Sequence, residues 1–76
     1  MYEIYSEVML TVPLTAQGLK AGNRGLVVHV HGDGEAYEVE FLTLAGETIA
    51  VATVDADLLR QVDNSSLSGP SVDTSR

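Results

Sequence analysis

Apolar and polar residues alternate along most of this chain with a period of two, which is typical of β-strands and not of helices. The predicted strands cover residues 7–12, 26–31, 36–42 and 48–54. In the first of them, Val8, Leu10 and Val12 share one face. Pro13 ends that strand because proline has no N–H group to donate to a ladder. The pattern therefore predicts an all-β protein.

The connections between these strands differ in length. Residues 14–25 form a long connector with a glycine at each bend, whereas residues 43–47 form a short turn in which Gly46 adopts a positive φ. Residues 55–60 interrupt the alternation, and we expect one helical turn there before a short last strand. Asp55 is the expected N-cap, its carboxylate accepting the N–H groups of Asp57 or Leu58.

The composition changes at residue 63, which divides the chain into two parts. Residues 63–76 contain five Ser, one Pro and one Gly, and we expect a flexible tail with too little apolar surface to fold alone. Residues 1–62 predict a small SH3-like β-barrel of about five short strands, a form that protects the edges of so short a sheet. The alternative is an open meander that dimerises through its edges.

The hairpin of the second and third strands predicts which residues face the core. With residues 32–35 as its loop, His29 lies opposite Glu38 and Val28 opposite Val39. The predicted core residues are Val8, Leu10, Val28, Val30, Tyr37, Val39, Phe41, Ile49 and Val51. The opposite face then carries His29, His31, Glu38 and Glu40.

The charge and the cysteine content limit the range of functions that fit this chain. The net charge is -7, from 4 basic and 11 acidic residues, whereas phosphate-binding domains normally carry a basic face. An acidic domain fits a basic protein partner better than a nucleic acid. The chain has no Cys, no signal-peptide pattern and no apolar run of the roughly 20 residues that cross a bilayer. We therefore expect a cytoplasmic protein without membrane contact.

Two short motifs suggest specific chemistry. The sequence GNRGLV resembles the glycine pattern of the KOW motif, with Lys20 and Arg24 as its phosphate contacts, although a plain turn is the simpler explanation of the glycines. His29 and His31 point to one side of a strand, and Glu38 across the hairpin completes a two-His, one-carboxylate set that suits Zn or Fe. The competing interpretation is an exposed polar face on which His29 pairs with Glu38.

Nothing in the sequence indicates catalysis, and we expect neither an enzyme nor a cofactor or metal. There is no Cys and no nucleophile elbow, and the carboxylates fall on exposed faces or in turns. Near the N-terminus, Tyr2 and Tyr5 are expected either to pack on the flank of the barrel or to anchor a partner.

Several small motifs in sequence order resemble a family of short bacterial proteins known as domain of unknown function 4926. The matching segments are Leu10-Thr11, Pro13-Leu14, Gly18-Leu19, Gly22, Gly25, Val27-Val28, residues 37–41, Gly46, Thr53 and Leu59-Arg60. The resemblance implies an SH3-like barrel similar to that of the nitrile hydratase beta subunit. The resemblance identifies no catalytic residues in this chain, and it implies an accessory barrel that binds a partner.

These observations together predict a small, non-catalytic protein-binding module, an accessory or neutralising partner of antitoxin or immunity type. The expected contact surface consists of His29, His31, Glu35, Glu38 and Glu40. Self-association into a homo-oligomer such as a dimer is also expected, because a core this small gains stability from an interface. The alternative function is a KOW-like nucleic-acid-binding barrel that uses Lys20 and Arg24.

Overall fold

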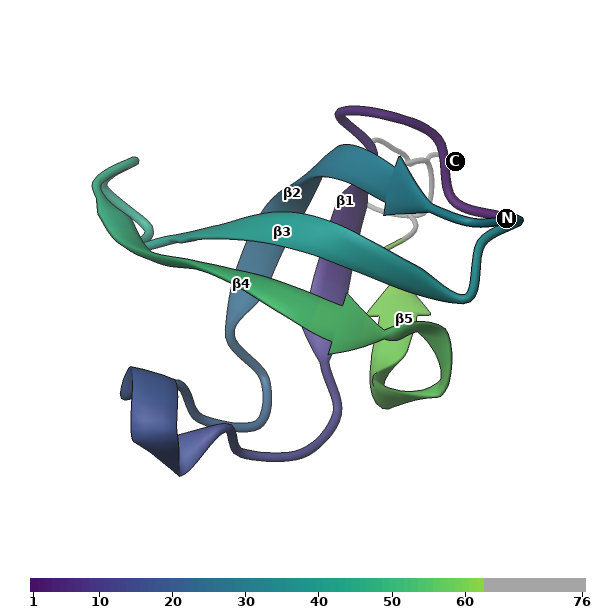
Figure 1. Cartoon of the computed structure of the whole chain (residues 1–76). Helices are drawn as coiled ribbons and strands as arrows, with labels where there is room; N and C mark the ends of the chain where they lie inside the picture. Colours follow the sequence, from purple (N-terminus) through teal and green to yellow (C-terminus); the bar gives the residue numbers. More distant parts are fainter. Residues whose placement is uncertain (63–76) are drawn as a thin grey trace, which may run out of the picture.

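The computed structural model describes residues 1–62, and this part of the chain is all-β, with five antiparallel strands in one sheet (Figure 1). The strands are β1 (Glu7–Leu10), β2 (Arg24–His31), β3 (Ala36–Leu42), β4 (Thr48–Asp55) and β5 (Leu59–Gln61). Two 3-10 turns, η1 (Thr15–Gln17) and η2 (Ala56–Leu58), lie in the β1–β2 and β4–β5 connections. The predicted all-β class, the five short strands and the helical turn before the last strand are confirmed. The strands form one open sheet, in which no ladder closes the predicted barrel within the described residues. The predicted tail, residues 63–76, lies outside the described residues.

The strands follow the order β4-β3-β2-β1-β5 across the sheet. Figure 1 shows β2, β3 and β4 curving past β1 and β5, so that one side of the sheet encloses the core. Within residues 1–62, no ladder joins β4 to β5, and these two strands form the ends of an open sheet. Both strands therefore keep a free edge.

The core is one cluster of side chains that all five strands and the β1–β2 connector contribute. Its buried members are Val8, Leu10, Leu19, Val27, Tyr37, Val39, Phe41, Ala52, Val54 and Leu59. The N-terminal residues close one end of this cluster, because the ring of Tyr2 lies against that of Tyr37 with centroids 5.1 Å apart. Tyr2 N–H also donates to Tyr37 Oη at 2.9 Å. The flank-packing interpretation therefore holds for Tyr2.

The β2–β3 hairpin has the predicted register near its turn and a different one further on. His29 pairs with Glu38 as expected, but a β-bulge between Val27 and His29 puts Val27 opposite Val39. Val27 is consequently buried, and the prediction that Val28 lies in the core is wrong. A bulge inserts one extra residue into a strand, which reverses the alternation on the far side of it.

The prediction of Ile49 and Val51 as core residues is also wrong. Their exposed fractions are 41% and 53%, and the buried face of β4 is formed by the alternate residues, including Ala52 and Val54. Val54 and Ala52 lie opposite Tyr37 and Val39 of β3. Large side chains already fill the core from β3, so small residues of β4 fit beside them and the larger ones turn outward.

The turns confirm some of the predicted backbone conformations and contradict one predicted hydrogen bond. Gly46 has a φ of 87°, as expected for the β3–β4 turn. Asp55 is the N-cap residue of η2, but its side chain makes no capping hydrogen bond, so that part of the prediction is wrong. Gly25, in contrast, is a buried residue within β2 and has no positive φ. Its role is to let β2 approach β3 closely.

Candidate functional site

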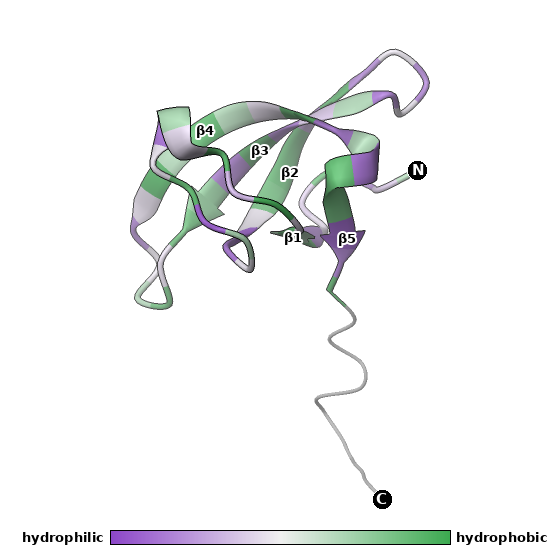
Figure 2. Cartoon of the chain, turned by 90° about the horizontal axis from the view of Figure 1, so that it is seen from below, coloured by the Kyte–Doolittle hydropathy of each residue, from purple (hydrophilic) through white to green (hydrophobic). Residues whose placement is uncertain are grey.

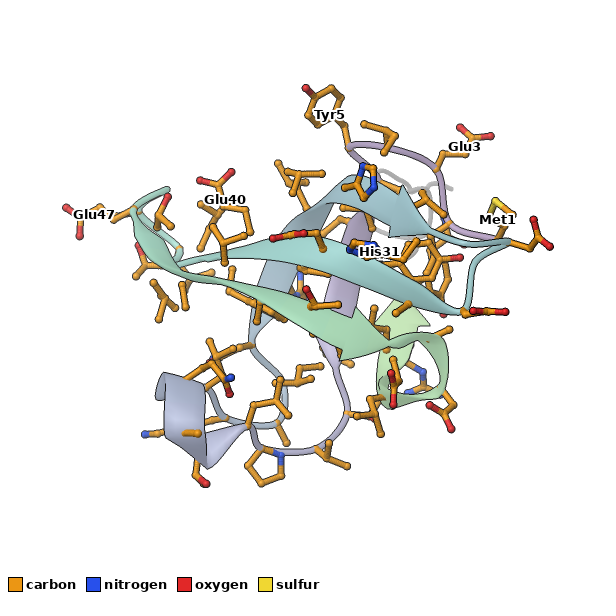
Figure 3. All side chains as sticks on the ribbon, viewed as in Figure 1. Met1, Glu3, Tyr5, His31, Glu40 and Glu47 are labelled. Carbon is orange, nitrogen blue, oxygen red and sulfur yellow. The ribbon has the colours of Figure 1, made fainter. Side chains whose placement is uncertain are left out.

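The side of β2, β3 and β4 that points away from the core is the candidate site, and we call it the outer face. Its residues are His29, His31, Glu38, Glu40, Ile49, Val51 and Thr53. Figure 3 shows His31 and Glu40 on this side of the sheet, with Glu47 at the tip of the β3–β4 turn. Figure 2 shows apolar and polar residues interspersed along these strands. The outer face is therefore mixed in character and not uniformly charged.

The histidines and Glu38 lie together on the outer face, but the pairing differs from the prediction. Although His29 is the cross-strand partner of Glu38, the Nε2 atom of His31 approaches Glu38 Oε1 at 3.4 Å. The rings of His29 and His31 meet edge to face, with centroids 4.7 Å apart. His31 thus reaches Glu38 along the diagonal of the ladder, which is a normal contact for long side chains.

Glu40 is held at the other end of the outer face by the neighbouring strand. Thr48 Oγ1 donates a hydrogen bond of 2.5 Å to Glu40 Oε2. The backbone neighbours of Glu40 are Leu26 on β2 and Val51 on β4, so an apolar residue lies on each side of this carboxylate. Glu40 is therefore an acidic group with an apolar residue on either side of it.

Glu35 lies apart from the other predicted contact residues. It precedes β3 in the β2–β3 turn, where its carbonyl oxygen accepts a hydrogen bond of 3.0 Å from Ala56 N–H. The structure therefore brings together His29, His31 and Glu38, with Glu40 further along the same strand, and leaves Glu35 at the rim of the hairpin.

The geometry does not form the metal site that the sequence suggested. Across residues 1–62, no three His, Cys, Asp or Glu side chains gather in a way that could hold a metal ion. The two imidazole rings lie edge to face, and only His31 approaches Glu38, at 3.4 Å. The three side chains therefore do not converge on one point. Among the described residues, the outer face therefore has no set of three side chains that could serve as metal ligands.

A surface hollow of about 430 Å³ opens at the end of the outer face. Its walls are Glu7, the Gly22–Leu26 segment and the Leu42–Leu44 segment. Leu44 at its rim is fully exposed. Sequence reasoning missed this hollow, although a leucine within the TLAG turn is a signal, since turns normally carry polar residues.

The same hollow includes the turn that resembles a KOW motif. Gly22 has a φ of 92°, and Asn23 N–H donates to the Lys20 carbonyl at 3.1 Å, which makes residues 20–23 a tight turn. Arg24 Nη1 lies 3.6 Å from Glu7 Oε2. One of the two cations predicted to contact phosphate is therefore already paired with a carboxylate.

Tyr5 is the exposed aromatic residue of the N-terminal segment. Its side chain is 73% exposed, and it has a φ of 68°, which is unusual for a bulky residue. Figure 3 shows its ring projecting from the molecule, away from the core. Tyr5 N–H donates to the Val27 carbonyl at 2.6 Å, which holds the segment against β2. Only Tyr5 of the two predicted tyrosine anchors is thus available to a partner.

Comparison with known proteins places the chain in a family without assigning it an activity. Neither the curated proteins nor the solved structures contain a match, so the predicted likeness to the nitrile hydratase beta subunit stays a prediction. No helix in the described part is long and apolar enough to span a membrane. The family described as Domain of unknown function matches residues 4–61, which include all five described strands. The chain therefore belongs to the domain of unknown function 4926 family, DUF4926.

Proposed function

We propose that this protein is a non-catalytic binding module that uses its outer face to hold a basic protein partner, as an accessory or neutralising subunit. The observation that carries the proposal is the exposure of Ile49 and Val51 on the outer face, where Val51 lies opposite Glu40 and Glu38 follows on the same strand. Exposed apolar side chains among charged ones are typical of protein interfaces, where apolar contacts supply affinity and charges supply selectivity.

The charge of the outer face favours a basic partner. Strands β3 and β4 contain no Lys or Arg, and the four basic residues of the chain are Lys20, Arg24, Arg60 and Arg76. The cation of Arg24 is paired with Glu7. The potential over the outer face is therefore negative, and it accelerates encounter with a positively charged surface and disfavours an acidic one.

Binding energy on this face comes from the apolar residues. Ile49 and Val51 are held in place by the sheet, so little conformational freedom is lost when a partner covers them. The hollow beside Leu26 and Leu42 extends the same face and can take an apolar side chain of the partner. A flat strand surface with a hollow at one end matches the central anchor and surrounding rim of protein interfaces.

The test compares two double variants with the same change in charge. Glu38→Lys with Glu40→Lys alters the outer face, and Glu3→Lys with Asp57→Lys alters exposed positions elsewhere. Tagged proteins are used to capture partners from native host lysate with and without nuclease, and the captured protein is identified by mass spectrometry. We expect a stoichiometric protein that survives nuclease, is lost with the outer-face variant and is retained by the control variant.

Two results contradict the proposal. Equal capture by both variants would remove the outer face as the contact surface. Recovery of nucleic acid, measured by absorbance at 260 nm and lost after nuclease, would support the alternative, a KOW-like module that uses Lys20 and Arg24. That alternative also predicts a steep loss of affinity with added salt, because counterions are released from phosphates on binding.

A further inference from the structure

The outer edge of β4 is a second candidate binding surface, and it is distinct from the outer face. β4 is the end strand of the sheet, and within residues 1–62 no other strand pairs with its far side (Figure 1). It is eight residues long, and the run from Thr48 to Val54 contains no charged residue and no proline. Proteins usually protect such edges with lysine, proline, bulges or short strands, because an unprotected edge pairs with other chains. β4 has a register shift at Ile49, but its pairing with β3 is regular from Ala50 to Val54, and this part of the edge has none of these protections.

The backbone groups on this edge are identified by the ladder between β3 and β4. Ala56 N–H donates to the Glu35 carbonyl, which starts the pairing just beyond the Ala36–Asp55 position. In an antiparallel ladder every second pair exchanges hydrogen bonds, so Val54 and Ala52 bond to β3. The N–H and C=O groups of Val51 and Thr53 then point outward, to the side of β4 on which no other described strand pairs.

The charges around the edge distinguish between possible occupants. Glu47 precedes the neutral run and Asp55 ends it. A two-fold pairing of β4 with a second copy, centred on Val51, would use the full strand but place each Glu47 opposite the Asp55 of the other chain. Like charges directly opposite one another destabilise a ladder, and each chain also carries a net charge of -7.

From these observations we infer that the outer edge of β4 binds an extended segment of a basic protein as a sixth strand. The segment has β-branched or apolar residues at alternate positions over its centre and Lys or Arg at both ends, facing Glu47 and Asp55. Main-chain hydrogen bonds to Val51 and Thr53 give affinity, and the flanking charges give selectivity. This inference rests on the proposed function and names the part of the partner that is recognised.

The probe is a nine-residue peptide, acetylated and amidated, with Lys at both ends and alternating Thr and Val between them. The matched peptide has Glu at both ends and the same centre. Binding to the full chain is followed by two-dimensional NMR together with amide hydrogen exchange. We expect the Lys-ended peptide to bind at least about tenfold more tightly than the Glu-ended one, a difference of about 1.4 kcal/mol.

Amide exchange locates the binding. In the free protein, the Val51 and Thr53 amides are expected to exchange faster than those of Ala52 and Val54, which bond to β3. Saturating Lys-ended peptide should slow exchange at Val51 and Thr53 by at least about tenfold and leave their neighbours unchanged. Thr53→Pro, which removes one outward N–H group, should weaken binding, whereas Thr53→Val should retain it. If Thr53→Pro fails to fold, amide hydrogen exchange in the unmodified protein, with and without the peptide, tests the inference instead.

Four results would overturn the inference. One is the absence of binding up to about 1 mM peptide. Another is peptide binding without protection of Val51 and Thr53. A third is equal affinity for the two peptides. Protection of the same amides in the free protein that rises with protein concentration would show that a second copy occupies the edge. In each case, continued loss of lysate capture by the Glu38→Lys, Glu40→Lys variant would leave the proposed function standing.

Discussion

Gly25 offers a sharp test of the described packing, because the structure assigns it a role that differs from that of the turn glycines. It lies in β2, the middle strand of the five, opposite Val8 on β1 and Phe41 on β3. A Cβ atom built on Gly25 would lie 2.5 Å from the Glu40 carbonyl oxygen and 2.7 Å from Val39 Cγ1. Contacts below 3.0 Å are essentially never seen for real Cβ atoms, so the neighbours must move.

The cost of Gly25→Ala follows from these contacts. The methyl of Val39 can move by a change of rotamer, whereas the Glu40 carbonyl belongs to the main chain of β3, which must retreat by at least about 0.5 Å. The ladders that join β3 to β2 and to β4 resist that movement. Overpacking costs about 1–3 kcal/mol, and a clash with the main chain falls near the upper end of that range. The gain of roughly 0.4–1 kcal/mol from a stiffer unfolded chain offsets only part of it. We expect a net destabilisation of about 2 kcal/mol.

Urea unfolding at 25 °C, followed by circular dichroism, measures this effect. With a slope of about 1 kcal/mol per M for a domain of this size, the midpoint should fall by about 2 M. Gly46→Ala is the matched control, because Gly46 has a φ of 87° and nothing within 4 Å of the added Cβ. It should cost only the left-handed backbone penalty of roughly 1 kcal/mol, and Gly46→Asn less. A midpoint for Gly25→Ala at or above that of Gly46→Ala would refute the close-approach explanation.

Three further predictions test individual assignments. Val39→Asp should unfold the domain, since it buries a carboxylate without a partner, whereas Val51→Asp on the exposed side should stay folded; two similar thermal melts would contradict the assigned faces. Tyr37→Phe should remove the acceptor for Tyr2 N–H and cost about 1 kcal/mol, lowering the melting temperature by roughly 4–8 °C, with Tyr5→Phe unchanged as its control. Tyr5→Asn should raise the melting temperature by a few degrees, because asparagine tolerates a positive φ better than tyrosine; a decrease would mean that the exposed ring contributes to packing.

The sequence predicted the candidate site in part. It placed His29, His31, Glu38 and Glu40 on one face, because residues two apart on a strand share a face and the hairpin loop sets the register nearby. It assigned the His–Glu contact to the wrong histidine, since a diagonal contact depends on how two strands twist past one another. The hollow near Leu44 joins residues from three separate segments, and no local pattern indicates their meeting.

By itself, the sequence determined the β class, the approximate limits of the strands, the glycine turn at Gly46 and the helical turn after Asp55, because alternation and turn chemistry act between near neighbours. Only the tertiary structure decided which side of β4 is buried. The run TIAVATV is apolar on both sides, and the limited space beside Tyr37, Val39 and Phe41 selects the smaller residues. The bulge at Val28 and the close approach at Gly25 were likewise decided between strands. The open edge of β4 has the same origin, since it depends on which strands find partners across the sheet.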